Sequence, residues 1–286
     1  MTPRQRIGNA FTSATCANLP DMGERARNRR FENPGPPSTS IEKALAVLSA
    51  LNGPLHSRSM SDLADEVGLP RPTLHRILKQ LANWGFVDQL PSNRYQVGMR
   101  LFELGTLVYH RMRLRTAAMT HLHSLYHKTE CTVYLTVSAG NEVLHLDCLP
   151  VKTKKPIPAR VGGRWSMHCS SVGKVLLAHA PREQIDEYVS GPLRPMTKYS
   201  IRDPVRLLEH LEHVRSVGYG ETIEESILGI YGVAAGIRSS SNNDVVAAIC
   251  IAGPDRDLLD DHDEVVRTAN AISRDLSSDN LNSHCT

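Results

Sequence analysis

The sequence lacks the patterns that mark secreted, membrane-spanning and disulfide-stabilised proteins. Its six cysteines are scattered and show no Cys-x-x-Cys spacing, which indicates free thiols in a reducing compartment and not a disulfide framework. No apolar run approaches the roughly 18 residues that a membrane helix requires, and the first residues contain no hydrophobic signal core. These absences predict a cytoplasmic protein that has no membrane partner.

The motifs of common enzyme classes are also missing. There is no Gly-x-Ser-x-Gly elbow, no phosphate loop and no dinucleotide fingerprint after a predicted strand. The main catalytic alternative makes Cys169 or Ser170 a nucleophile and His168 its base. Adjacent residues on one strand or loop point apart, so His168 and Cys169 are poorly placed as a pair. We therefore expect no catalytic residue, no cofactor and no metal site, and predict that the protein is not an enzyme.

The overall charge is too small to indicate a nucleic-acid partner by itself. The 286 residues carry a formal net charge of +3, with 22% charged and 41% hydrophobic residues. This composition is typical of a globular protein, and the chain is long enough for two domains that each bury a core. Nucleic-acid binding must therefore be argued from the local distribution of charge.

The stretch 70–81 combines an apolar face with a cationic face and contains no acidic residue. Its apolar side chains recur at i, i+3, i+4 and i+7, which predicts a helix with one buried stripe. The opposite face can donate hydrogen bonds to DNA, and an ordinary amphipathic surface helix is the simpler alternative. The buried stripe consists of Leu74, Ile77, Leu78 and Leu81, and the opposite face of Pro72, His75, Arg76 and Lys79.

A first helix is expected earlier in the chain, over residues 41–51. Ser40 is its predicted N-cap, and the sequence Asn52-Gly53-Pro54 is expected to end it. Its predicted buried side chains are Ile41, Leu45 and Leu48.

A second helix is predicted to begin after Ser59, because Ser59 and Asp62 have the spacing of a capping box. Gly68 ends it, and only Leu69 separates that glycine from the stretch 70–81. A short helix, a tight glycine turn and a helix with a polar face form a helix-turn-helix.

Two β-prone segments follow, over residues 84–90 and 95–97, around the turn Pro91-Ser92-Asn93-Arg94. A hairpin behind a helix-turn-helix is a wing, so the sequence predicts a winged-helix domain that binds double-stranded DNA. The wing tip, at Asn93 and Arg94, would reach the DNA backbone or minor groove. The residues expected to contact DNA are Ser59, Arg71, Pro72, Thr73, His75, Arg76, Lys79, Asn93 and Arg94.

Three further regions flank this domain. The first 39 residues mix prolines with a run of arginines and predict a disordered basic arm, for which a solvated tail is the simpler alternative. After residue 99 the pattern is helical, with an apolar face that one small domain cannot cover, so we expect pairing with a second copy. That face consists of Leu101, Leu104, Leu107 and Val108. The predicted boundaries are 1–39 for the arm, 40–99 for the winged helix, 100–115 for a linker helix and 116–280 for a second domain.

The second domain alternates strands and helices from about residue 132, which predicts an α/β or α+β fold. A hairpin is expected around Ala139-Gly140-Asn141, and the helix after Ser170 begins with small residues that can present backbone N–H groups to an anion. His123 and His127 have the i, i+4 spacing of a metal pair, but no third ligand is near, so we favour surface histidines. Further helices are predicted over 204–217 and 257–277, and strands over 233–237 and 245–252.

The order and spacing of several segments resemble the IclR family of bacterial transcriptional regulators, over residues 40–278. The resemblance implies a winged helix, a linker helix and a C-terminal effector-binding domain with a PAS/GAF-like curved sheet. It also implies homodimers, often paired into homotetramers, on a palindromic operator. The segments include Gly68-Leu69-Pro70-Arg71-Pro72-Thr73-Leu74-His75-Arg76-Ile77-Leu78, Tyr95-Gln96-Val97-Gly98, His168-Cys169-Ser170-Ser171-Val172-Gly173-Lys174, Val214-Arg215-Ser216-Val217-Gly218-Tyr219 and Ile249-Cys250-Ile251-Ala252-Gly253-Pro254.

The resemblance also implies where a small-molecule effector binds. Relatives that bind very small keto acids tend to carry more polar residues at the positions of Thr222, Cys250 and Ala252. We therefore expect a larger or more apolar organic acid, aromatic or branched, with Arg164 or His168 as its carboxylate partner. The predicted effector-binding residues are Arg164, Met167, His168, Cys169, Ser170, Ser171, Thr222, Ile230, Gly232, Cys250 and Ala252.

The sequence thus predicts a ligand-responsive DNA-binding transcription regulator, for which RNA polymerase is a conceivable further partner. Two alternatives come from other classes of protein. One is an enzyme with a fused winged helix, against which the missing catalytic motifs argue. The other is an interaction module whose winged helix binds protein instead of DNA.

Overall fold

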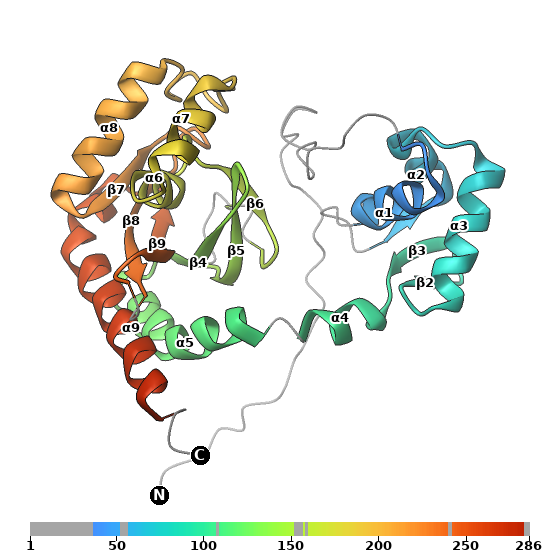
Figure 1. The fold of residues 1–286 in the computed structure, drawn as a ribbon, viewed down its shortest axis with the longest axis horizontal. Helices are drawn as coiled ribbons and strands as arrows, with labels where there is room; N and C mark the ends of the chain where they lie inside the picture. The colour runs from blue at the N-terminus through green and yellow to red at the C-terminus, as the bar shows by residue number, and fades with distance from the viewer. Residues whose placement is uncertain are drawn as a thin grey trace, which may run out of the picture. The chain divides into compact units, whose positions relative to one another are not determined.

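The computed structural model describes residues 37–51, 57–106, 109–151, 157, 160–239 and 242–282. An N-terminal helical domain and a C-terminal α/β domain lie within these ranges (Figure 1). Residues 1–36 of the predicted basic arm, the predicted helix stop at 52–54, and Leu107 and Val108 lie outside the described residues. Among the described helices, none is long and apolar enough to cross a membrane.

The N-terminal domain is a winged helix-turn-helix, as the sequence predicts. Three helices pack on a small antiparallel sheet whose strand order is β1-β3-β2, and the β2–β3 hairpin is the wing. The first strand, β1, was not anticipated because only two residues of it pair with β3. The elements are α1 (Ser40–Leu51), β1 (Arg58–Ser59), α2 (Met60–Val67), α3 (Arg71–Asn83), β2 (Val87–Gln89) and β3 (Arg94–Val97).

The predicted caps and stripe of α2 and α3 are confirmed. Ser59 and Asp62 form a complete capping box, and Gly68 ends α2 with a left-handed φ of 68°. Leu74, Ile77 and Leu78 are buried in the core of this domain, together with Leu63 and Tyr95 of neighbouring elements. Leu81 is half-buried at the edge of the stripe.

The predicted stripe of α1 is wrong at two of its three positions; the third side chain, Leu48, packs against the core of this domain. Ile41 is 74% exposed and Leu45 is 57% exposed, whereas Val47, Ala50 and Leu51 are buried. The helix carries apolar residues on more than one face. The face that packs against α2 and α3 is the one with Val47, Ala50 and Leu51.

The N-cap of α1 also differs from the prediction. Ser40 is already helical, and the cap is one residue earlier. The Thr39 hydroxyl accepts a hydrogen bond from the Glu42 backbone N–H at 3.2 Å, and the Glu42 carboxylate accepts one from the Thr39 N–H at 2.9 Å. Thr39 and Glu42 therefore form the capping box of this helix.

The described parts of the predicted linker helix over 100–115 belong to α4 (Met99–Thr106) and α5 (Tyr109–Thr129). Within α5, Leu114, Ala118, Leu122 and Leu125 are buried in the core of the C-terminal domain. The predicted boundary at 115 between the linker helix and the second domain therefore lies inside one continuous helix.

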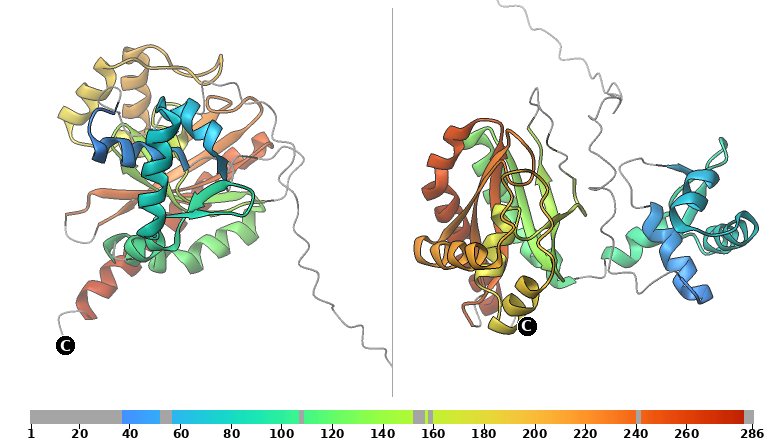
Figure 2. Two further views of the ribbon diagram at one scale, coloured as in Figure 1. Left: turned by 90° about the vertical axis from the view of Figure 1, so that its right-hand side faces the viewer. Right: turned by 90° about the horizontal axis from the view of Figure 1, so that it is seen from above.

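The C-terminal domain is built on one curled antiparallel sheet with strand order β6-β5-β4-β9-β8-β7 (Figure 2). Helices α5 and α9 cover one face, and α6, α7 and α8 lie over the other face (Figure 1). The strands are β4 (Thr132–Ala139), β5 (Glu142–Leu149), β6 (Arg164–Ser166), β7 (Tyr219–Ile223), β8 (Tyr231–Arg238) and β9 (Val245–Gly253). The remaining helices are α6 (Ser171–Ala178), α7 (Arg182–Ser190), α8 (Pro204–Val217), a short 3-10 helix (Arg256–Asp261) and α9 (His262–Asn282).

Each central strand buries both of its faces. On β4, Val133 and Leu135 pack in the core shared with α5 and α9, whereas Tyr134 between them packs in the core shared with α6. The expected fold class, a winged helix followed by an α/β effector-type domain, is therefore confirmed, although β6, β7 and α7 were not anticipated.

Candidate DNA interface and effector site

The exposed face of α3 carries the side chains that the sequence predicts for DNA contact. Pro72, His75, Arg76 and Lys79 are exposed, and Thr73 at the margin is half-buried. The guanidinium of Arg71, also exposed, donates a hydrogen bond to the Ser61 hydroxyl at 3.1 Å, so α2 supports the first turn of α3. The structure thus brings together a cationic, hydrogen-bonding surface on one helix.

The other predicted DNA contacts have structural partners of their own. The Ser59 hydroxyl accepts a hydrogen bond from the Asp62 N–H at 3.2 Å. Asn93, at the wing tip with a left-handed φ of 56°, accepts a hydrogen bond from the Gln89 amide at 2.9 Å. Arg94 turns inward and donates to both the hydroxyl and the carbonyl of Ser57, at 2.9 Å in the first case. Arg94 therefore anchors the wing to the chain before β1.

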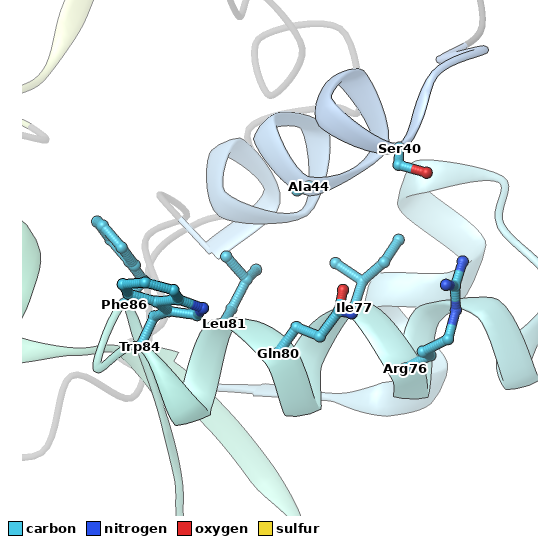
Figure 3. A pocket seen from close by; sticks show the side chains of 8 residues that line it. All are labelled: Ser40, Ala44, Arg76, Ile77, Gln80, Leu81, Trp84 and Phe86. Atoms are coloured by element: carbon cyan, nitrogen blue, oxygen red, sulfur yellow. The ribbon is translucent and has the colours of Figure 1, made fainter.

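A groove of about 480 Å³, not foreseen from the sequence, runs between α1 and α3 (Figure 3). Arg76 lies at one end of it, and Trp84 and Phe86 lie at the other. The Trp84 side chain is 75% exposed. The groove is lined by Ser40, Ala44, Arg76, Ile77, Gln80, Leu81, Trp84 and Phe86.

The short helix α4 also presents apolar side chains to solvent. Met99 and Phe102 are each 67% exposed, and Leu104 is 45% exposed. Ile41, Leu45 and Trp84 are exposed as well, and so many exposed large apolar side chains in so small a domain are typical of a protein that has a protein interface.

In the C-terminal domain, the N-terminal turn of α6 lies over the sheet. A Cβ atom on Gly232 would lie 3.4 Å from the Ser171 hydroxyl and 3.2 Å from the carbonyl oxygen of Ile251. Thr222 pairs with Gly232, and Gly232 pairs with Ala252, so these three residues form one row across β7, β8 and β9. The absence of a side chain at Gly232 lets Ser171 approach this row.

A second row runs alongside the first and contains Cys250. Ala234 pairs with Cys250, Cys250 with Tyr134, and Tyr134 with Cys148, from β8 across to β5. Burial raises the pKa of the Cys250 thiol, and a hydrogen bond with Ser171 opposes the rise. Of the predicted effector residues, the structure therefore brings together Ser171, Thr222, Gly232, Cys250 and Ala252, and Ile230 is buried one residue before β8.

The two expected carboxylate partners, Arg164 and His168, make other contacts. Arg164 lies on β6, at the opposite edge of the sheet from Thr222, and forms an ion pair of 3.3 Å with Glu142. The Nδ1 atom of His168 lies 2.7 Å from the Tyr188 hydroxyl of α7. Both side chains thus have protein partners, and a role for either at the ligand stays a prediction.

The segment before α6 holds that helix in position. Ser170 caps α6 by accepting a hydrogen bond from the Gly173 N–H at 3.2 Å. A Cβ atom on Gly173 would lie 2.3 Å from the backbone of Met167, so only glycine allows this close packing. Cys169 is fully buried, and burial raises the pKa of its thiol, which argues against the catalytic role considered above.

Four buried polar residues of this domain each have one side-chain atom without a hydrogen-bond partner in the described part of the chain: Tyr134, His145, Thr222 and Glu225. Of these, only Thr222 is a predicted effector-binding residue. Burial lowers the pKa of His145 to about 4 and raises that of the Tyr134 hydroxyl. The sequence did contain a hint, since Tyr134 and His145 interrupt apolar strands at positions that face a helix.

A buried ion pair between Lys174 and Glu225 was also missed. Their nitrogen and oxygen atoms lie 2.6 Å apart, and Lys174 has no exposed surface. Burial lowers the pKa of Lys174, and the adjacent Glu225 carboxylate opposes this shift.

Within the described ranges, no group of three His, Cys, Asp or Glu side chains is arranged to hold a metal ion. His123 and His127 are exposed on α5. The nearby His121 makes a 2.7 Å contact with Asp275 of α9.

Comparison with known protein families agrees with this architecture. The model of the IclR helix-turn-helix domain matches residues 40–91, and the model of the bacterial transcriptional regulator IclR C-terminal domain matches residues 106–278. The second match alone covers more than half of the chain. The chain belongs to the IclR family. It is therefore a transcriptional regulator with a helix-turn-helix DNA-binding domain and a C-terminal ligand-binding domain, and not an enzyme.

Two characterised IclR-family relatives match most of the chain. The transcriptional repressor AllR of Salmonella paratyphi A is 31% identical over 244 residues, which cover 83% of this chain and 89% of AllR. The transcriptional regulator XynR of Escherichia coli K12 is 28% identical over 244 residues, which cover 83% of this chain and 96% of XynR.

Solved structures of IclR-family proteins share the fold. An IclR homolog from Microbacterium hydrocarbonoxydans, crystallised in complex with 4-hydroxybenzoate, is 28% identical with a TM-score of 0.77 and covers 84% of this chain and 100% of its own. The IclR protein of Thermotoga maritima is 28% identical with a TM-score of 0.67 and covers 83% of this chain and 98% of its own.

Proposed function

We propose that the winged helix binds a palindromic operator as a dimer or tetramer, and that an aromatic or branched organic acid in the C-terminal domain controls this binding. The observation that carries the proposal is the exposed face of α3, which combines His75, Arg76 and Lys79 on a helix without an acidic residue. The second helix of a helix-turn-helix enters the major groove, and its N-terminal residues contact base edges.

Eight of the nine predicted contacts divide into three roles on this proposal, and the ninth, Pro72, belongs to the first turn of α3. Arg71, Thr73, His75 and Arg76 read bases or position the helix, because they lie on the first two turns of α3. Lys79 and the wing-tip Asn93 hold phosphates, while Ser59 and Arg94 act through the structure of the domain.

Dimer formation is supported by the apolar side chains that α1 and α4 expose. Two copies of the same surface form a closed interface, and two winged helices then read two half-sites together. Phe102→Glu is expected to shift the purified protein toward monomer in sedimentation velocity and to weaken operator binding. Val205→Glu, at a 62% exposed position on α8, is the matched control. A Phe102→Glu protein that assembles like the wild type removes α4 from the interface.

An acid effector is supported by the N-terminus of α6. The Ser170 hydroxyl accepts a hydrogen bond from the Gly173 N–H. The N–H groups of Ser171 and Val172 lie in the first turn of the helix, so they have no intrahelical acceptor. These groups and the positive end of the helix dipole favour a carboxylate. The small side chains of Cys250, Ala252 and Gly232 leave room for an apolar body, and the Microbacterium hydrocarbonoxydans homolog was crystallised with an aromatic acid.

The effector can change DNA binding only by favouring one arrangement of the dimer over another. The helices α4 and α5, which join the winged helix (40–99) to the effector domain (116–280), are the proposed elements that respond. We place this activity in the cytoplasm, with RNA polymerase as a further partner at the promoter.

Fluorescence anisotropy of the full chain on labelled DNA from upstream of its own gene tests the proposal. We expect selective binding over a scrambled sequence, with an affinity that falls as salt rises. Titration with 4-hydroxybenzoate, benzoate and branched short-chain acids then tests the effector. Absence of binding to any DNA at low salt would instead favour a winged helix that binds protein.

A further inference from the structure

Two buried polar side chains of the effector domain lie side by side beneath α6. Tyr134 lies on β4 between Cys250 and Cys148, and His145 lies on β5 opposite Thr136. The ring centroids of Tyr134 and His145 are 4.5 Å apart, with 32° between the ring planes. Tyr134 packs in the core shared with α6, and pairing of Thr136 with His145 places the imidazole on the same face of the sheet.

Each of these side chains has one polar atom without a protein partner. Tyr134 is 3% exposed, and its hydroxyl has no hydrogen bond to any described residue. His145 is also 3% exposed; its Nδ1 atom lies 2.9 Å from the Thr136 hydroxyl, whereas Nε2 has no partner among the described residues. Buried polar atoms in folded proteins nearly always have a partner, so two neighbouring exceptions on one face indicate a bound group.

Neither side chain of this pair is charged at pH 7. Burial raises the pKa of Tyr134, and the neighbouring thiols of Cys148 and Cys250 add to the rise; burial raises the pKa of each thiol as well. His145 is shifted by burial alone, to a pKa of about 4, and is therefore neutral at pH 7. A neutral, buried pair is a poor site for a carboxylate and a good site for an uncharged hydrogen-bonding group.

We infer that Tyr134 and His145 bind an uncharged hydroxyl group of the effector, at the end opposite its carboxylate. This inference rests on the proposed function, which places the carboxylate at the N-terminus of α6 beside Thr222. Thr222 and Tyr134 lie three strands apart in the sheet, or about 14 Å between backbones. The residues that face α6 on the two strands between them are small: Gly232, Ala234, Cys250 and Ala252.

The first test needs no ligand. In Tyr134→Phe, a buried hydroxyl without a partner is removed, so the ligand-free protein is expected to melt at least about 2 °C higher. The matched control is Tyr126→Phe, which removes a hydroxyl from α5 on the other face of the sheet. An unchanged or lower Tm for Tyr134→Phe overturns the inference, because it shows that the hydroxyl is already satisfied in the absence of effector.

The second test compares 4-hydroxybenzoate with benzoate by isothermal titration calorimetry. We expect the wild type and Tyr126→Phe to bind the hydroxylated acid about tenfold more tightly, which is the effect of one net hydrogen bond. In Tyr134→Phe this preference is lost while the Kd for benzoate is unchanged, and His145→Gln reduces it. A Tyr134→Phe protein that binds both acids equally weakly overturns the inference, because that result indicates a structural role.

The two tests fail separately. If the wild type binds neither acid, the aromatic acid of the proposed function is excluded, and the thermal comparison still decides whether Tyr134 is a binding residue. If both acids bind with equal affinity to the wild type, the proposed function stands and the inferred hydroxyl site is overturned.

Discussion

The ammonium nitrogen of Lys174 lies 2.6 Å from Oε1 of Glu225, and the Lys174 side chain has no exposed surface. Lys174 is on α6, and Glu225 follows β7 by two residues. The backbone carbonyl of Glu225 accepts a further hydrogen bond from the Ser200 hydroxyl at 2.7 Å. The pair therefore ties together the two elements that flank the proposed carboxylate site.

Breaking this ion pair is expected to destabilise the C-terminal domain strongly. Lys174→Met leaves the Glu225 carboxylate buried without its cation, which should lower the free energy of unfolding by about 3–5 kcal/mol. Urea denaturation followed by circular dichroism measures the loss. The control is Arg182→Met, which breaks an exposed i, i+4 pair with Asp186 on α7 and should cost at most about 0.5 kcal/mol. A similar small loss for both variants would contradict this account.

Substitutions on α3 should separate base recognition from phosphate contact. Arg76→Ala is expected to weaken operator binding by about 1–3 kcal/mol and to relax the preference at one base pair. Lys79→Ala should weaken binding to all sequences equally and reduce the salt dependence by about one counterion. Anisotropy on a set of single-base operator variants distinguishes them. If Arg76→Ala leaves the base preference unchanged, Arg76 does not read a base.

We expect the main role of Arg94 to be stabilisation of the folded winged helix, and not contact with DNA. Arg94→Ala removes the hydrogen bonds to Ser57 that anchor the wing, at a cost of about 1.5–3 kcal/mol. The variant should therefore unfold at lower urea concentration even without DNA. Asn93→Gly, which tolerates the left-handed φ at the same turn, should weaken DNA binding with a smaller change in stability. Equal stability of Arg94→Ala and the wild type would return Arg94 to the phosphate role predicted from the sequence.

His145 should make the effector domain sensitive to acid. Its pKa in the folded protein is about 4, below the usual 6.5, so the unfolded chain takes up the proton first as the pH falls. Stability is therefore fully present above pH 6.5 and is lost toward pH 4, by about 2 kcal/mol between pH 7 and pH 5. His145→Gln should reduce this loss in urea titrations at the two pH values, whereas His123→Gln at an exposed position should not.

Local patterns in the sequence were sufficient for the winged helix. The spacing of Leu74, Ile77 and Leu78 and the glycine at position 68, which has a positive φ, are signals that depend only on residues close together in the sequence. The bounds of α2 and α3 could therefore be predicted closely. The side chains buried by α1 depend on where α2 and α3 lie. Periodicity identified the helix, but it could not choose between Leu45 and Val47 as the inward position.

The effector site depends on pairings that are distant in the sequence. Lys174 and Glu225 are 51 positions apart, and Tyr134 meets His145 only because the β4–β5 pairing shifts register between Leu135 and Thr136. Local periodicity contains no information about such a shift. The same limit explains Arg164, which was expected at the ligand but pairs with Glu142 because β6 lies at the far edge of the sheet.

The two tryptophans of the chain are divided between the two domains. Trp84 is largely exposed in the groove of the winged helix, and Trp165 lies on β6 against the core beneath α6. Each variant that replaces one of them by phenylalanine leaves a single tryptophan, in the other domain. The tryptophan fluorescence of one variant can thus report effector binding, and that of the other can report assembly of the DNA-binding domain, in separate samples of unlabelled protein.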